Sequence, residues 1–170
     1  MGETKIELPS VYLHPGEVHL ARTPTILKTL LGSCVGATIW DPCAGLGALC
    51  HGVLPRCPRQ VSPTEGYRYV DFAIRDLLRR FESLGAQRSE LQVKLFGGAD
   101  VLPVGKANAK PTVGRQNLET ALEVLREENL KAIASDLGGT LGRAIEFHTG
   151  TGEVSLRRLQ KAEFEADDLM

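Results

Sequence analysis

Hydrophobic residues come in short runs along the first third of the chain, and glycine, serine and proline separate these runs. Residues 27–31, 35–40 and 46–54 are apolar, contain β-branched or aromatic members and are bounded by turn residues, which is typical of β-strands. The sequence DPCAG at 41–45 predicts a hairpin between the second and third strands. Residues 56–66, which include Pro58 and Pro63, are expected to form a loop that covers one end of the sheet.

After this loop the hydrophobic spacing becomes helical. Apolar residues recur three or four positions apart at Val70, Ile74, Leu77, Leu78 and Phe81, and Gly85 supplies a stop signal. A second helix is predicted over 116–129, because Leu118, Leu122 and Leu125 form one stripe and acidic residues occupy the opposite face.

The remaining pattern is again that of strands. Leu91, Val93 and Leu95 alternate with polar neighbours and lead into the turn residues Gly97 and Gly98. Further strands are predicted at 132–135, 144–148 and 154–159, with TGTG joining the last two as a hairpin. The pattern favours an α/β sandwich with a mixed, largely antiparallel sheet and about two to three helices, in a single domain over 1–170. From about 160 we expect a flexible, solvated acidic tail.

Composition narrows the possible functions. The chain has 170 residues, of which 42% are hydrophobic, enough for one core without disulfides or structural metal. Twenty basic and 21 acidic side chains give a net charge of −1 without a long basic stripe, which disfavours binding to nucleic acid or to anionic membranes. The sequence shows neither a membrane-spanning run nor a signal pattern, so we expect a cytoplasmic protein. The cysteines at 34, 43, 50 and 57 are therefore expected to be free thiols.

Cys34 and His51 are the candidate catalytic pair. If the hairpin folds symmetrically about the bond between Pro42 and Cys43, Cys34 lies opposite His51, with Cβ atoms about 4.5–5.5 Å apart. A neighbouring imidazolium lowers the pKa of a thiol and makes it a better nucleophile. Small residues before Cys34 would admit a substrate carbonyl, and the backbone N–H groups of Ser33 and Cys34 could hold an oxyanion.

The same residues also allow a purely structural interpretation. A cysteine in an apolar strand is commonly a small core residue, and a register shift of one residue would move His51 to the other face of the sheet. The spacing C-x8-C-x6-C-H-x5-C lacks a C-x2-C pair, which disfavours a structural zinc site. The glycine pairs at 97–98 and 138–139 lack the other residues of a phosphate-binding loop and predict tightly packed turns.

Five segments, in order, carry a family resemblance: LLGSCVGATIWDP, GALCHGVLP, FGGAD, VGRQN and SDLGGTLGR. They extend from about 27 to 143, and His51 follows Cys34 by 17 positions. Together these segments resemble the motifs of the CheD family of chemoreceptor glutamine deamidases. The resemblance implies hydrolysis of selected glutamine side-chain amides on methyl-accepting chemotaxis receptors, which yields glutamate and ammonia.

The resemblance also implies roles for particular residues. Family members use a Cys-His-Thr arrangement, which assigns the first two roles to Cys34 and His51. The family often has threonines at two adjacent positions shortly before the cysteine, whereas this chain has Lys28 and Thr29. Thr29 is therefore the candidate third residue, and an ordinary β-strand residue is the alternative interpretation. The implied thioester mechanism requires no metal or organic cofactor. A CheC-type phosphatase is an implied regulatory partner, and 97–104 is either its contact surface or a loop that closes a strand.

Two other functions remain open at this point. A papain-like protease or amidase would use the same chemistry, but it usually places its cysteine at a helix N-terminus, whereas the sequence after Cys34 predicts a strand. A chemotaxis adaptor that binds a CheC-type phosphatase would not need the thiol. The presence of both Cys34 and His51 favours the enzyme.

Overall fold

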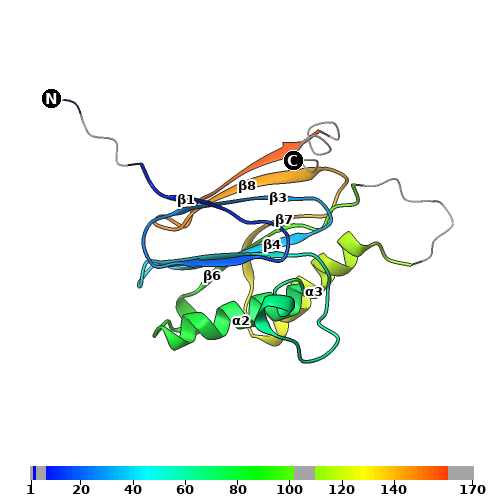
Figure 1. The fold of residues 1–170 in the computed structure, drawn as a ribbon, viewed down its shortest axis with the longest axis horizontal. Helices are drawn as coiled ribbons and strands as arrows, with labels where there is room; N and C mark the ends of the chain where they lie inside the picture. The colour runs from blue at the N-terminus through cyan, green and yellow to red at the C-terminus, as the bar shows by residue number, and fades with distance from the viewer. Residues whose placement is uncertain (1, 3–6, 102–109, 161–170) are drawn as a thin grey trace.

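Two β-sheets and a layer of helices make up the molecule, as the computed structural model shows (Figure 1). The structure describes residues 2, 7–101 and 110–160. Within this part, five of the seven strand pairings are antiparallel and two are parallel. The predicted α/β sandwich with a mixed, largely antiparallel arrangement is thus confirmed, and the predicted tail from 161 onward lies outside the described residues.

The first sheet has the strand order β1-β3-β8-β9, and the second has the order β2-β5-β4-β6-β7. The first contains β1 (Ser10–Tyr12), β3 (Ile26–Leu31), β8 (Gly142–His148) and β9 (Val154–Leu159). The second contains β2 (Val18–Ala21), β5 (Leu46–Gly52), β4 (Val35–Asp41), β6 (Gln92–Gly97) and β7 (Ala132–Leu137). The helices are α1 (Pro63–Gly66), α2 (Val70–Ser83) and α3 (Val113–Glu127), with a 3-10 turn at Arg88–Glu90.

Two apolar layers hold these elements together. Alternate residues of β4, namely Val35, Ala37 and Ile39, join the layer that packs against α2 and α3. The second layer lies between the sheets and is built by residues such as Leu27, Leu31, Leu49, Phe96 and Phe147. In Figure 1 the helices lie on one side of the second sheet and the first sheet lies on the other.

The predicted register of the β4–β5 hairpin was wrong by two residues. The loop between the strands contains residues 42–45, and His51 pairs with Gly36 rather than with Cys34. The side chain of Asp41 accepts hydrogen bonds from the backbone N–H groups of Cys43 (2.9 Å) and Ala44 (3.2 Å), which stabilises the longer turn. A shift of two residues keeps each side chain on its face, so Cys34 remains on the same side as His51, at a diagonal position.

The predicted strands β3 and β4 do not belong to one sheet. β3 lies in the first sheet and β4 in the second, so the three residues between them, 32–34, carry the chain across from one sheet to the other. Cys34 therefore lies at a crossover, just before β4. The short strands β1 and β2, which sequence periodicity did not predict, complete the two sheets at their edges.

The turn after β6 lies against this crossover, and it gives a first testable prediction. Gly97 has φ +102°, and a Cβ atom there would lie 2.2 Å from the carbonyl oxygen of Cys34. Gly45 also has a positive φ, +66°, but a Cβ atom there would have no neighbour within 4 Å. We expect Gly45→Ala to lower the free energy of unfolding by about 1 kcal/mol, and Gly97→Ala to lower it by about 3 kcal/mol or more. Urea unfolding measures both, and equal losses would contradict the close approach.

Candidate active site

The nucleophile candidate lies on the crossover between the sheets. Cys34 is half-buried and forms no disulfide bond, and its side chain packs at the margin of the apolar layer between the sheets. The preceding residue Ser33 is also half-buried. A thiol at this position combines access from outside with a partly desolvated environment.

Hydrogen bonds hold the three carbonyl groups of the crossover. They run from Ala99 N to Gly32 O (3.0 Å), from Asn117 Nδ2 to Ser33 O (2.9 Å) and from Gly98 N to Cys34 O (2.8 Å). No described peptide bond is cis, and in a planar trans peptide the C=O and N–H groups point in opposite directions. Anchoring the carbonyls of Gly32 and Ser33 therefore directs the N–H groups of Ser33 and Cys34 away from the protein groups that hold those carbonyls.

His51 is held from the opposite sheet. Its imidazole is 2% exposed and faces the layer between the sheets. Nδ1 lies 2.7 Å from Oγ1 of Thr29 on β3, and that hydroxyl donates to the carbonyl of Leu13 at 2.8 Å. Because the hydroxyl has one proton and gives it to Leu13, Oγ1 must accept from Nδ1–H. The proton of the neutral imidazole is thus on Nδ1, and the lone pair is on Nε2.

The other nitrogen of His51 is buried without a hydrogen-bond partner among the described residues. Burial lowers the pKa of His51 from its ordinary 6.5 to about 4; the charge of Glu17 partly opposes this effect, and that of His14 adds to it. The resting imidazole is therefore neutral at neutral pH. The sequence predicted a charged imidazolium at this position, whereas the buried His51 is neutral because it lies deep between the sheets. The Nε2 lone pair of this neutral imidazole is available to accept a proton, and burial makes the imidazole a weaker base than that of an exposed histidine.

The structure joins Thr29 to His51 and places Cys34 against the same layer between the sheets. Thr29 contacts His51 directly, whereas its neighbour Lys28 points to the other face and forms an ion pair with Glu146 at 3.4 Å. Cys34 lies two residues before Gly36, the pairing partner of His51, on the same face. Cβ atoms at such diagonal positions are about 7–8 Å apart or somewhat closer, which is within reach of a long side chain such as that of His51.

Two supports of this site were not predicted from the sequence as functional. Asn117, on α3, is fully buried, and its amide holds Ser33. Arg143 is 3% exposed and bonds to Asp136 (2.6 Å) and to the carbonyl of Gly138 (2.8 Å). Gly138 N in turn donates to the carbonyl of Gly97 at 2.9 Å, so this network supports the turn against the crossover. The motifs VGRQN and SDLGGTLGR contain these residues, but only the fold shows what they contact.

The segment 97–104 is only partly described. Gly97, Gly98 and Ala99 are buried and close strand β6, so this part is a strand-closing turn rather than an exposed surface. Residues 102–104 lie outside the described residues.

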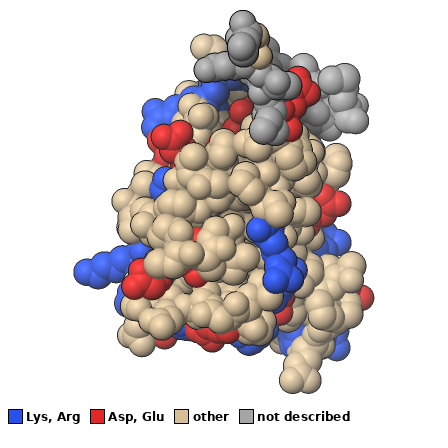
Figure 2. Space-filling view, turned by 90° about the vertical axis from the view of Figure 1, so that its left-hand side faces the viewer, with Lys and Arg blue, Asp and Glu red and all other residues tan. Residues whose placement is uncertain are grey.

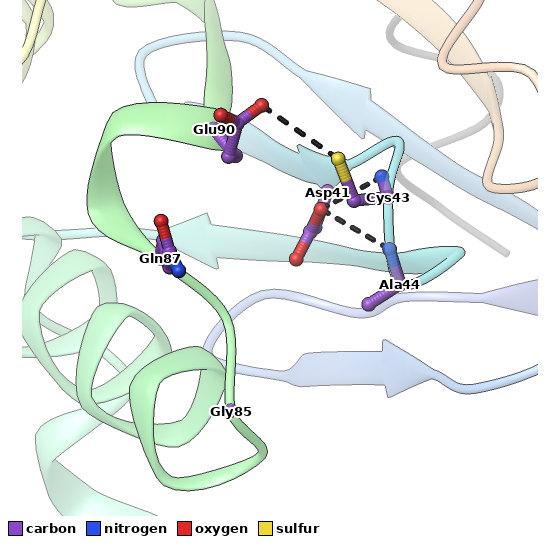
Figure 3. Close-up of a pocket in the computed structure, with 6 residues that line it drawn as sticks. All are labelled: Asp41, Cys43, Ala44, Gly85, Gln87 and Glu90. Carbon is purple, nitrogen blue, oxygen red and sulfur yellow. Dashed lines mark hydrogen bonds between the residues drawn. The ribbon is translucent and has the colours of Figure 1, made fainter.

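The other cysteines lie in different surroundings. Cys43 lines an open cavity with Asp41 and Glu90 (Figure 3), and the charge of Glu90 together with desolvation raises the pKa of its thiol. Burial raises the pKa of Cys50 to about 11. Both thiols are therefore poorer nucleophiles than an ordinary cysteine at neutral pH. The four cysteines are not paired in disulfide bonds.

The surface has charged side chains of both signs, in agreement with the net charge of −1. Figure 2 shows an end of the molecule where Lys and Arg lie among Asp and Glu, and uncharged residues occupy most of the area. No helix in the described ranges is long and apolar enough to cross a membrane. Among the same residues, no cluster of three or more His, Cys, Asp or Glu side chains is arranged to hold a metal ion.

Comparison with known proteins adds an independent result. A family model described as CheD chemotactic sensory transduction matches residues 53–158. A probable chemoreceptor glutamine deamidase CheD 2 of Geobacter sulfurreducens is 46% identical over 157 residues, which cover 92% of this chain and 94% of the relative. Proteins named probable chemoreceptor glutamine deamidase CheD are similar too. The protein from Maridesulfovibrio salexigens is 36% identical over 96% of this chain and 100% of its own length. The protein from Pseudomonas syringae pv. syringae is 38% identical over 96% of this chain and 93% of its own length.

The buried histidine predicts how stability depends on pH. The unfolded chain binds a proton at His51 near pH 6.5 and the folded chain near pH 4, so stability falls as the pH drops through this window. We expect a loss of about 3 kcal/mol from this group between pH 7 and pH 4. His51→Gln should remove that part of the pH dependence, and the control His19→Gln should keep it. Urea unfolding at several pH values tests this, and equal slopes for wild type and His51→Gln would contradict it.

Proposed function

The chain belongs to the CheD family, and we propose that it is a chemoreceptor glutamine deamidase with Cys34 as the nucleophile. The substrate is the side-chain amide of particular glutamines in the cytoplasmic region of a methyl-accepting receptor, and the products are glutamate and ammonia. One observation carries the assignment of residues. The Thr29 hydroxyl fixes the tautomer of His51 so that Nε2, the nitrogen with a lone pair, is left for Cys34 and the substrate.

The first step forms a bond between sulfur and carbon. His51 Nε2 takes the proton of the Cys34 thiol while sulfur attacks the carboxamide carbon of glutamine. The electron pair of the C=O bond moves onto oxygen and gives a tetrahedral oxyanion. The N–H groups of Ser33 and Cys34, whose peptide groups are oriented by the anchored carbonyls of Gly32 and Ser33, stabilise this charge.

The second step releases ammonia. An amide nitrogen cannot leave as an anion, so His51 Nε2 returns its proton to that nitrogen as the C–N bond breaks. The product is a γ-glutamyl thioester on Cys34, and His51 is neutral again. The low pKa of the buried imidazole favours this transfer, because the imidazolium formed in the first step is a stronger acid than an exposed one.

Water then completes the reaction. His51 Nε2 takes a proton from water as the oxygen attacks the thioester carbon, and the C–S bond breaks when the tetrahedral intermediate collapses. The thiolate regains the proton from His51, and the new carboxylic acid of the glutamate side chain loses its proton to solvent as it leaves. The overall reaction consumes one glutamine amide and one water. The residues named here suffice for these steps, so we propose a mechanism without a metal or organic cofactor.

The position of Cys34 disfavours a papain-like alternative. Cys34 precedes strand β4 rather than a helix, and its histidine lies on the adjacent strand β5. Family membership supports two finer proposals, a location in the cytoplasm and regulation by a CheC-type phosphatase partner. Gel filtration of the chain with such a phosphatase tests the second, and separate elution at micromolar concentrations would contradict it.

Deamidation of a receptor fragment tests the proposed function. We expect the wild-type chain to convert specific glutamines to glutamate in the presence of a chelator, as detected by peptide mass spectrometry. Cys34→Ala should abolish conversion, and His51→Gln should lower its rate by about 10²–10⁴-fold. Because the two residues act as one unit, the double variant should be no slower than Cys34→Ala.

Cys43→Ala is the matched control for this experiment, because Cys43 lies on the β4–β5 turn at the other end of the hairpin from Cys34. It should retain wild-type turnover. A folded wild-type chain that modifies no receptor glutamine but binds a CheC-type phosphatase would favour the adaptor function instead. Loss of turnover on chelation would overturn the cofactor-free mechanism.

Thr29 provides a separate prediction about the histidine. Thr29→Val keeps the shape of the side chain but removes the hydroxyl, which leaves the tautomer of His51 unfixed. We expect kcat to fall roughly tenfold to a hundredfold with KM for the receptor fragment unchanged, because Thr29 is buried. Thr29→Ser keeps the hydroxyl and should remain within about threefold of wild type. Equal losses in kcat for the two variants would show that the hydroxyl does not act through His51.

A further inference from the structure

Asn117 bridges the two strand ends on which the site is built. It lies on α3, its side chain is 0% exposed, and its Nδ2 donates to Ser33 O and to Val53 O, both at 2.9 Å. Ser33 directly precedes Cys34, and Val53 follows His51 by two positions. One side-chain amide therefore connects the segment of the nucleophile with the segment of the base.

The bridge lies where the strand ladder ends. The last pair of the β4–β5 ladder is Val35 with Gly52, so Ser33 and Val53 are beyond the region in which the strands bond to each other. Both groups that face Asn117 are carbonyl oxygens, which only accept hydrogen bonds. The two protons of one NH₂ group satisfy both, whereas the reversed amide would place Oδ1 against two acceptors. The contacts thus require an amide donor at this position.

Helix α3 is itself fixed against the site. Gly114, one turn before Asn117, lies so close to the β6 turn that a Cβ atom on it would be 2.3 Å from Ala99 O. The N-cap Thr112 accepts from Arg115 N at 3.2 Å and also hydrogen-bonds to Asp100. The helix and the turn therefore form one packed support, and Asn117 holds Ser33 from a rigid position.

We propose that Asn117 is a positioning residue, which orients the Ser33–Cys34 peptide so that the N–H group of Cys34 faces the oxyanion. Backbone N–H groups of the β6 turn hold the carbonyls of Gly32 and Cys34, but the carbonyl of Ser33 is held by this side chain. Without the bridge the Ser33–Cys34 peptide can rotate, and the N–H group of Cys34 is no longer held in place before the oxyanion forms. The inference rests on the proposed role of Cys34 as nucleophile.

Two small reagents distinguish a loss of oxyanion stabilisation from a loss of thiol reactivity. p-Nitrophenyl acetate acylates Cys34 through a tetrahedral oxyanion: the S–C bond forms, the C–O bond breaks, and p-nitrophenol carries away the thiol proton. Chloroacetamide alkylates the same sulfur by direct displacement of chloride, with no oxyanion. Mass spectrometry of the Cys34 peptide measures the rate of each reaction and excludes the other thiols. Neither reagent needs a receptor, so the result is independent of whether receptor deamidation succeeds.

We expect Asn117→Ala to slow acylation of Cys34 about a hundredfold, as for the loss of one oxyanion donor, while alkylation stays within about threefold of wild type. Gln116→Ala, on the same helix, is the matched control, because the Gln116 amide donates to the carbonyl of Pro111 at 2.9 Å and not to the crossover. It should change neither rate. In the receptor assay Asn117→Ala should lower kcat and leave KM unchanged.

A parallel fall of acylation and alkylation would overturn the proposal, since a merely structural role affects both reactions. Acylation within threefold of wild type in folded Asn117→Ala would overturn it as well. If Asn117→Ala does not fold, Asn117→Ser decides the matter, because its hydroxyl donates to one carbonyl only. We expect it to slow acylation at least tenfold relative to alkylation. Wild-type acylation by folded Asn117→Ser would overturn the proposal.

Discussion

The candidate site depends on one hydrogen bond that crosses between the two sheets, from His51 Nδ1 to Thr29 Oγ1. The imidazole is buried, and an unsatisfied N–H there would cost about 1–3 kcal/mol. The Thr29 hydroxyl can accept this proton because its own proton goes to the carbonyl of Leu13. A backbone carbonyl in the β1–β2 connection thus decides which nitrogen of the histidine has a lone pair. The two-sheet arrangement is needed for this geometry, because His51 is on the second sheet, Thr29 is on the first, and Leu13 is in the connection between β1 and β2.

The crossover between the sheets shows how folding and catalysis share the same contacts. A chain that leaves one sheet for another loses its ladder partners, yet its buried carbonyls must be satisfied. Here the β6 turn and Asn117 supply the donors for residues 32–34. Because the C=O and N–H of a trans peptide point in opposite directions, holding these carbonyls against the β6 turn and Asn117 directs the peptide N–H groups away from them. The oxyanion donors in the proposed mechanism follow from this requirement of folding.

Local patterns predicted the elements but not the contacts between them. Helix α2 and strand β9 were predicted closely, because amphipathic spacing and turn residues mark their ends. The hairpin register depended on the loop length, which the side chain of Asp41 sets by bonding to the turn. Thr29 came from a family resemblance and not from its spacing. The role of the Leu13 carbonyl has no signal in the sequence, because every residue has such a group and only the fold selects one.

The burial of His51 changes how the thiol is activated. An exposed histidine beside a cysteine would favour a resting ion pair, whereas this imidazole is neutral because charging it would place an ion between two sheets. In the proposed mechanism the proton therefore leaves Cys34 during attack on the amide, and the oxyanion donors act at the same moment. Selectivity for an amide then depends on the fixed donors around Cys34 as much as on the sulfur itself.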